Sequence, residues 1–257
     1  MGYRMGGSII TIDAKPAPIA IDVGRAAVLV VDMQNDFGAP TGMFARAGID
    51  VSPIRRVIPP IAKLVECTRR LAIPTVYLKM AFREDLSDAG PPDCPNRLKH
   101  AIFGIGTEST APDGGRSRVL IRDTWNTDIV DELRPATTDV VLYKTRYSGF
   151  YQTELDSVLR ARGVTHLLVT GCTTSVCVES TIRDAMFRDY HCVLLADCTA
   201  EPIGSDFPRT NHEASLLVIQ TLFGFVSESV HVIRALQHVM PDLAPDGAVM
   251  PEAPPRG

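Results

Sequence analysis

An acid, a lysine and a cysteine each stand at or just beyond the end of a short apolar run, where their side chains could react together. Asp32 and Lys144 follow runs of mainly aliphatic residues, and Cys177 follows the run 167–170 after Gly and hydroxyl residues. Such runs are typical of strands buried in a parallel sheet. Because open α/β sheets bind ligands at the carboxyl ends of their strands, we expect these three side chains at one edge of one sheet.

The position of Cys177 in the first turn of a predicted helix favours a nucleophile. Unpaired N–H groups and the helix dipole favour negative charge there, so we expect a thiol with a lowered pKa, and Thr174 or Ser175 as the N-cap. A buried structural cysteine is the alternative, since free cysteine is among the most buried residue types. Because Asp32 and Lys144 are expected at the same sheet edge, we interpret Cys177 as a catalytic residue.

These stretches resemble the isochorismatase-like superfamily of cysteine hydrolases, over about residues 26–236. Within it, five phrases are most similar to the ureidoacrylate amidohydrolases and to biuret hydrolase-like enzymes: VVDMQN, AGPPDCPN, DTWNTDIVDEL, KTRYSGFYQTELDSVLRARG and CTTSVCVESTIRDA. By motif, the resemblance implies Asp32, Lys144 and Cys177 as a catalytic triad, and the amides of Thr173 and Cys177 as the oxyanion hole. It also implies a cis peptide bond just before Thr173.

The implied activity is that of a cysteine-dependent amidohydrolase, which cleaves a C–N amide or ureido bond of a small molecule and releases ammonia or an amine. Asp32 would take the thiol proton, the thiolate would attack the carbonyl, and a water activated by the same carboxylate would hydrolyse the thioester on Cys177. Lys144 would stabilise the charges, and fixed N–H groups would bind the oxyanion. This chemistry needs no metal and no organic cofactor.

Aromatic and polar residues near the same sheet edge are the predicted substrate-binding groups. They comprise candidate pocket walls and candidate partners for polar ends of a substrate: Phe37, Phe82, Trp125, Tyr147, Asn96 and Asp88. Ordinary core packing is the alternative for the aromatic residues, and turn formation for the other two. Met80 stands where ureidoacrylate amidohydrolases carry an amide, and a thioether cannot bind a ureido group as an amide does. That difference leaves room for a more apolar amide or a carbamoyl compound such as biuret.

Strands and helices are predicted to alternate, which specifies a three-layer α/β/α domain with a mostly parallel, doubly wound sheet. The expected strands are 26–31, 74–78, 139–143, 166–170 and 192–195, and the expected helices are 57–71, 152–162, the nucleophile helix up to 188, and 210–223. The stretch 81–118, rich in Gly, Pro and Asp, is too long for a simple connection. We expect it to cover the site.

One domain is expected at residues 23–240, because a chain of 257 residues with 45% hydrophobic content can bury one large core. Residues 1–22 are predicted to be an N-terminal arm, and the Pro-rich residues 241–257 a C-terminal tail. Either could instead wrap a neighbouring subunit. The resemblance implies a homo-oligomer, either a dimer or a tetramer.

Composition and residue spacing argue against several classes of partner and site. The formal net charge is −4 with acids and bases interspersed, so no basic face for nucleic acid is expected. No stretch reaches the roughly 18 apolar residues of a membrane helix and no apolar signal-peptide core is visible, so a cytoplasmic location is predicted. The six cysteines form no CxxC pair, and no histidine follows the second strand in the spacing that related nicotinamidases use for metal. Neither a metal site nor a disulfide framework is predicted.

Three alternatives stay open. The substrate could be a larger or cyclic amide. The chain could be an isochorismatase proper, which hydrolyses a vinyl ether without a cysteine nucleophile and is disfavoured by Cys177. The fold could also be a catalytically silent scaffold. Thiol reactivity separates these classes, because a scaffold's buried cysteine should react slowly with iodoacetamide at neutral pH, whereas the triad predicts one fast site that Asp32→Asn suppresses.

Overall fold

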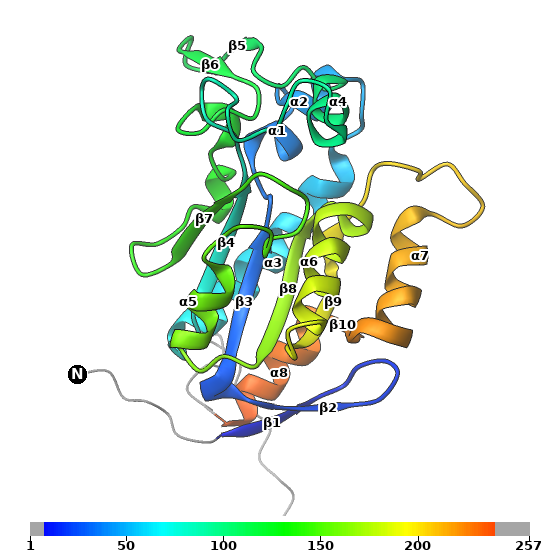
Figure 1. The fold of residues 1–257 in the computed structure, drawn as a ribbon. Coiled ribbons are helices and arrows are strands. Elements are labelled where there is room, and N and C mark those ends of the chain that lie inside the picture. Colours follow the sequence, from blue (N-terminus) through cyan, green and yellow to red (C-terminus); the bar gives the residue numbers. More distant parts are fainter. Residues whose placement is uncertain (1–7, 240–257) are drawn as a thin grey trace, which may run out of the picture.

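The computed structural model describes residues 8–239, which form a six-stranded sheet between helical layers (Figure 1). In sheet order the strands are β10 (Phe225–Ser227), β9 (His191–Ala200), β8 (His166–Cys172), β3 (Ala26–Val31), β4 (Thr75–Met80) and β7 (Val140–Lys144). Every neighbouring pair is parallel. The predicted three-layer fold with a parallel, doubly wound sheet is confirmed.

Helices cover both faces of the sheet. One face packs against α3 (Ser52–Arg70) and α8 (Ser229–Val239), and the other against α5 (Leu155–Ala161) and α6 (Glu179–Met186). Alternate residues of β3 belong to the two cores because strand side chains point to opposite faces. A strand covered on both faces must be apolar throughout, which explains the continuous run that marked β3 in the sequence.

The direction of strand addition reverses at β3. β4 and β7 lie on one side of it, and β8, β9 and β10 on the other. The carboxyl ends of β3 and β8 therefore meet at a topological switch point, where such sheets bind ligands. Gly171 permits their close approach, since it has a φ of +111° and a Cβ there would lie 2.0 Å from the carbonyl oxygen of Val31.

Short elements gather over the carboxyl edge of the sheet (Figure 1). They are α1 (Asn35–Gly38), α2 (Met43–Arg46), α4 (Pro95–Ala101), and the strands β5 (Glu108–Thr110) and β6 (Arg116–Arg118). The stretch 81–118 is thus partly regular. Asp36 links these elements, because its buried carboxylate accepts hydrogen bonds from the Leu120 N–H (2.7 Å), the Met43 N–H (3.1 Å) and the Asn126 amide.

We predict that Asp36 makes stability depend on pH. Burial raises its pKa from 3.8 to about 6, although hydrogen bonds from Asn126, Leu120 and Met43 lower it. The folded state therefore binds more protons than the unfolded state between about pH 4 and pH 6. The stabilisation from this group is present below that window and decreases as the pH rises through it, by at most about 3 kcal/mol.

Denaturant unfolding of the wild type and of Asp36→Asn, at about pH 4.5 and about pH 7, measures this contribution. We expect the wild type to lose stability relative to the variant between the two pH values. A constant offset between the two proteins would contradict the prediction, because the amide does not titrate.

The chain before Val23 differs from the predicted arm. β1 (Ile9–Ile12) and β2 (Ile19–Asp22) form an antiparallel hairpin, and alternate isoleucines of both strands are buried in the core that contains α8. The period-two alternation was the signal for these strands, but each strand has only four residues. Residues 1–7 and the predicted tail at 241–257 lie outside the described residues.

The carboxyl-terminal third differs in two further ways from the predicted elements. The helix expected at 210–223 is α7 (Asn211–Val218) followed by a π-helical turn, Ile219–Phe223. Neither β10 nor α8 was predicted. Among residues 8–239, no helix combines the length and the apolar character needed to span a membrane.

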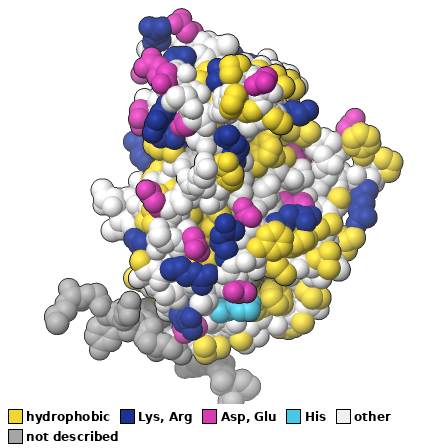
Figure 2. Space-filling view, in the orientation of Figure 1, with side chains coloured by type: hydrophobic (Ala, Val, Ile, Leu, Met, Phe, Trp, Pro, Cys, Tyr) yellow, Lys and Arg dark blue, Asp and Glu magenta, His cyan; other side chains and the backbone are white. Residues whose placement is uncertain are grey.

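An exposed apolar face lies over α6, α7 and the turn after α7, where Figure 2 shows hydrophobic side chains gathered. Its large side chains are between 41% and 67% exposed: Met186, Phe187, Leu217 and Leu222. This is a cluster of large apolar side chains in contact with solvent in the single chain. We call it the α6–α7 face.

Candidate active site

Asp32 and Lys144 form a buried ion pair at the carboxyl edge of the sheet. Lys144 Nζ lies 2.7 Å from Asp32 Oδ2, and the two side chains are 0% and 1% exposed. Lys144 ends β7, two strands from β3, and its side chain passes the end of β4, where Nζ lies 3.7 Å from Met80 Sδ. Burial lowers the pKa of Lys144, but the charges of Asp32 and Cys177 outweigh burial and raise it, so the lysine stays protonated.

Backbone contacts fix the Asp32 carboxylate. The Met80 N–H donates to Asp32 Oδ1 over 2.9 Å and to Gln34 Oε1 over 2.7 Å, and Gln34 Nε2 donates to the Met80 carbonyl over 3.0 Å. Asp32 itself has a φ of +51°, in the left-handed region that residues with side chains seldom adopt. Apart from Lys144, no N–H or hydroxyl of residues 8–239 donates to Oδ2. That oxygen is left to the lysine and to the thiol.

Cys177 lies in a π-helical turn, Thr174–Val178, that connects β8 to α6, and its side chain is buried. The thiol lies near enough to both members of the ion pair for each to act on its pKa: burial and the Asp32 carboxylate raise the pKa of Cys177, while Lys144 opposes them. The expected lowering of the thiol pKa is therefore wrong, because burial and a neighbouring negative charge outweigh the helix amides. The resting residue is a thiol with a proton acceptor beside it.

The turn that carries Cys177 is held from two sides. Ser175 donates through its N–H (3.0 Å) and its hydroxyl to Glu201 Oε2, and the Thr174 hydroxyl lies 2.9 Å from His212 Nδ1. The prediction that Thr174 or Ser175 caps the helix is wrong, because both side chains bond to other elements. The residue at the cap position, Thr173, makes no side-chain capping bond.

The peptide bond between Cys172 and Thr173 is cis, as the resemblance implied. Thr173 directly precedes the nucleophile turn, and Cys177 lies within it. The two residues proposed as the oxyanion hole are therefore in the same segment as the thiol.

His100 packs against two of the predicted substrate-binding residues, Phe82 and Tyr147. The His100 ring centroid is 5.3 Å from that of Phe82 and 5.6 Å from that of Tyr147. After burial, negative charge on Cys177 is the next largest influence raising the pKa of Tyr147, so the phenol lies near the nucleophile. His100 was missed because only histidines at strand ends were considered. Its position in the stretch expected to cover the site was the available signal.

Phe37 and Trp125 belong to the cap over the sheet edge. The Phe37 ring packs edge-on against Phe44 with centroids 5.0 Å apart, within the main core. Trp125 is partly buried, and its carbonyl accepts a hydrogen bond from Asn35 Nδ2 over 2.8 Å. The packing alternative describes Phe37, and a substrate contact of either residue stays a prediction.

Asn96 and Asp88 hold the covering stretch together. Asn96 Nδ2 donates to the Ala89 carbonyl over 3.0 Å, and Asp88 Oδ2 lies 2.7 Å from a guanidinium nitrogen of Arg122. Both side chains therefore already have partners within the protein, and a substrate contact of either stays a prediction.

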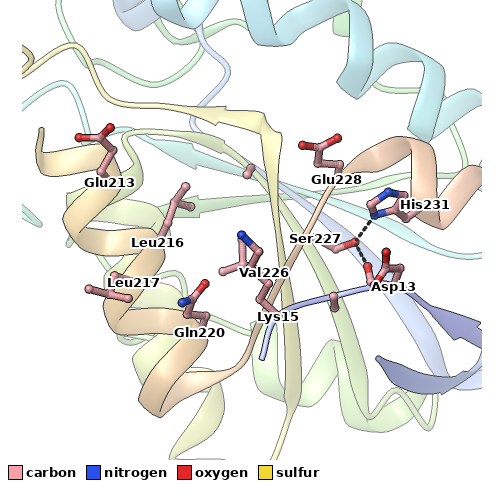
Figure 3. Close-up of a pocket in the computed structure, with 12 residues that line it drawn as sticks. Asp13, Lys15, Glu213, Leu216, Leu217, Gln220, Val226, Ser227, Glu228 and His231 are labelled. Atoms are coloured by element: carbon pink, nitrogen blue, oxygen red, sulfur yellow. Dashed lines mark hydrogen bonds between the residues drawn. The ribbon is translucent and has the colours of Figure 1, made fainter. Parts of the chain in front are cut away.

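Residues 8–239 contain no group of three or more His, Cys, Asp or Glu side chains arranged to hold a metal. All six cysteines lie in this part of the chain and are free thiols. A separate cleft of about 360 Å³ opens beside β10, between the hairpin turn, α7 and α8 (Figure 3). Its lining includes Lys15, Gln220 and Ser227, and none of the three candidate catalytic residues. The Ser227 hydroxyl there donates to the Asp13 carbonyl.

A family model, the Isochorismatase domain, matches residues 26–229. The chain belongs to the isochorismatase family. This isochorismatase-family chain is 40% identical over 245 residues to the ureidoacrylate amidohydrolase RutB of Methylobacterium radiotolerans, covering 95% of the chain and 91% of that protein. It is 41% identical over 219 residues to RutB of Methylorubrum extorquens, covering 85% and 86%.

Solved structures of related hydrolases have the same fold as this chain. A cysteine hydrolase from Pseudomonas syringae pv. phaseolicola matches with a TM-score of 0.71 and 30% identity, covering 91% of this chain and 99% of the other. N-carbamoylsarcosine amidase from Thermoplasma acidophilum matches with a TM-score of 0.59 and 27% identity, covering 80% and 96%. The resemblance to the isochorismatase-like superfamily is therefore confirmed.

Proposed function

We propose that this protein is a cysteine-dependent amidohydrolase that cleaves a C–N amide or ureido bond of a small molecule through a thioester on Cys177. The observation that carries the proposal is the buried Asp32–Lys144 ion pair at the switch point of the sheet, near enough to the Cys177 thiol for both charges to act on its pKa. The similarity to ureidoacrylate amidohydrolases and to N-carbamoylsarcosine amidase supports a ureido or carbamoyl group as the target.

Proton transfer accompanies attack in this mechanism, because the thiol pKa is raised. Asp32 Oδ2 takes the proton as Sγ bonds to the carbonyl carbon, and the electron pair of the C=O bond moves to oxygen. The amides of Thr173 and Cys177 are proposed to bind that oxyanion. The C–N bond then breaks as Asp32 returns the proton to the leaving nitrogen. A water that gives its proton to Asp32 attacks the thioester and releases the acid, and the thiolate takes that proton back.

Lys144 has an electrostatic role in this proposal. Its raised pKa keeps it protonated beside Asp32 and Cys177 through the cycle. The positive charge stabilises whichever of the two groups carries the negative charge, so the proton can move between them at little cost.

The positive charge of Arg146 favours a substrate with a carboxylate, such as ureidoacrylate. Its side chain is partly buried and donates to the carbonyls of Asp88 (3.3 Å) and Thr145 (2.6 Å), but no acid of residues 8–239 forms an ion pair with it. Its charge also acts on His100, above the triad. Met80, which stands where ureidoacrylate amidohydrolases carry an amide, is a weaker argument against this substrate than the sequence suggested. Its side chain is 1% exposed and lies against Lys144.

The test is ammonia release from ureidoacrylate, biuret, N-carbamoyl amino acids, primary amides and nicotinamide, with Cys177→Ala as the matched control. We expect turnover of a ureido compound that the control lacks, and an acyl adduct on the Cys177 peptide in acid-quenched enzyme. Undiminished turnover by Cys177→Ala would overturn the proposal. Silence on every compound together with the absence of any acyl adduct on Cys177 would favour the scaffold.

The predicted homo-oligomer is part of the proposal, and the α6–α7 face supports it. Large apolar side chains exposed in one chain are the kind of surface that a second copy covers. Light scattering of the purified protein gives the mass directly, and a monomer at micromolar concentration would contradict it. The cytoplasmic location stays a prediction.

A further inference from the structure

His100 is a buried histidine that the proposed reaction does not use. It lies in α4, over the carboxyl edge of the sheet, and is 6% exposed. Its ring packs between Phe82 and Tyr147, which restricts its orientation. The charges of Asp32, Lys144 and Arg146 all act on it, so the ring is close to the triad.

The hydrogen bond of His100 assigns its tautomer. Nδ1 lies 2.7 Å from the carbonyl oxygen of Asn96. Because a carbonyl oxygen only accepts, Nδ1 carries the proton, and Nε2 of the neutral ring has a free lone pair. Burial lowers the pKa of His100, and Lys144 and Arg146 lower it further, against the Asn96 carbonyl and Asp32. The ring is therefore neutral near pH 7, and Nε2 is an acceptor.

This acceptor has no partner within the described chain. No donor of residues 8–239 bonds to Nε2. The side-chain polar atoms of this region that are both sealed from solvent and unpartnered are Asp32 Oδ2 and Thr75 Oγ1, so Nε2 is still accessible. An oriented, accessible acceptor near the Asp32–Lys144 pair is suited to an N–H donor on the substrate.

We propose that His100 Nε2 accepts a hydrogen bond from the terminal NH2 of a ureido, carbamoyl or primary amide substrate and so determines specificity for that group. The inference rests on the proposed function and adds a binding residue to it. An analogue with OCH3 in place of NH2 can accept but cannot donate, and would leave Nε2 unpaired. Sites that lose such a bond discriminate strongly against the analogue.

The test compares His100→Phe and His100→Gln on ureidoacrylate and on its methyl carbamate analogue, in which OCH3 replaces the terminal NH2. Phenylalanine keeps a ring between Phe82 and Tyr147 but has no acceptor, whereas the glutamine amide retains one. We expect kcat/KM of His100→Phe for ureidoacrylate to fall by about 10- to 100-fold. The value for the methyl carbamate should change by less than about threefold, and His100→Gln should recover part of the loss.

Equal losses on both compounds would assign His100 a packing role and overturn the proposal, and so would unchanged kinetics. The same comparison can be made without turnover, by calorimetric binding of the two compounds to Cys177→Ala and to Cys177→Ala/His100→Phe. If the thioester mechanism fails while ureidoacrylate still binds, a loss of discrimination in the double variant supports His100 on its own. Identical dissociation constants, or no binding of ureidoacrylate to either variant, would overturn the role of His100.

Discussion

Asp32→Asn is expected to lower kcat/KM for the ureido substrate by about 10³- to 10⁴-fold, near the upper range for the loss of a general acid–base residue. In the wild type the Met80 N–H donates a hydrogen bond to Asp32 Oδ1 over 2.9 Å. The asparagine amide oxygen can still accept this bond, so the local structure should survive. What is lost is the acceptor for the thiol proton. Because burial raises the thiol pKa, we expect little thiolate on Cys177 near neutral pH once this acceptor is removed.

The same variant distinguishes a thiol from a preformed thiolate. The Asp32 carboxylate raises the pKa of Cys177, so its removal lowers that pKa and would accelerate an enzyme that works through a standing thiolate. The measurement is kcat/KM and the rate of iodoacetamide alkylation, each from about pH 6 to about pH 9. Asp139→Asn is the matched control, because Asp139 precedes β7 and pairs with Arg69. Faster alkylation with retained turnover in Asp32→Asn would contradict proton transfer to Asp32.

Lys144→Met is expected to destabilise the protein by about 3–5 kcal/mol and to remove most activity. Lys144 and Asp32 are 0% and 1% exposed, so loss of the lysine leaves a buried carboxylate without its counter-charge. Methionine is similar in length and apolar, so the change in volume is small. Without the ammonium, the thiol pKa loses the influence that lowers it, and the negative charge of the reaction is uncompensated.

The double variant Asp32→Asn/Lys144→Met separates charge from packing. With both charges removed, we expect most of the lost stability to return while turnover stays absent, because a neutral pair needs no counter-charge. Denaturant unfolding of the wild type, both single variants and the double variant near pH 7 gives the coupling energy. Additive losses in the double variant would show that Lys144 acts by packing alone.

The three candidate catalytic residues could be predicted from sequence because each follows or ends a strand of the central sheet, of which β3 and β8 are buried on both faces and β7 is a partly exposed edge strand. Such strands are readable as continuous apolar runs, and the parallel sheet then brings their carboxyl ends together. The positions of Asp32, Lys144 and Cys177 at one edge of the sheet follow from these apolar runs and from the motifs shared with the isochorismatase-like superfamily. The hairpin β1–β2 was not, because two short strands separated by a loop give a weak periodic signal.

The direction of the Cys177 pKa shift could not be predicted from sequence. A helix start favours the thiolate, and that rule is local. Burial of the thiol in the folded domain and the approach of the Asp32 carboxylate, which lies more than a hundred residues earlier in the chain, reverse the sign. His100 was missed for a similar reason, since its role depends on the packing of α4 against Phe82 and Tyr147.

The three candidate catalytic residues and the segment 81–118 above them belong to different parts of the chain. Asp32 follows β3, Lys144 ends β7 and Cys177 lies in the turn after β8, whereas His100 and Phe82 belong to the segment 81–118 above the sheet. We therefore expect substitutions in that segment to alter which carbonyl compound is admitted while Asp32 and Cys177 keep their places. Relatives of this protein could therefore differ in substrate while they keep the same reacting residues. Exchange of residues 81–118 between relatives is the corresponding route for engineering a new specificity.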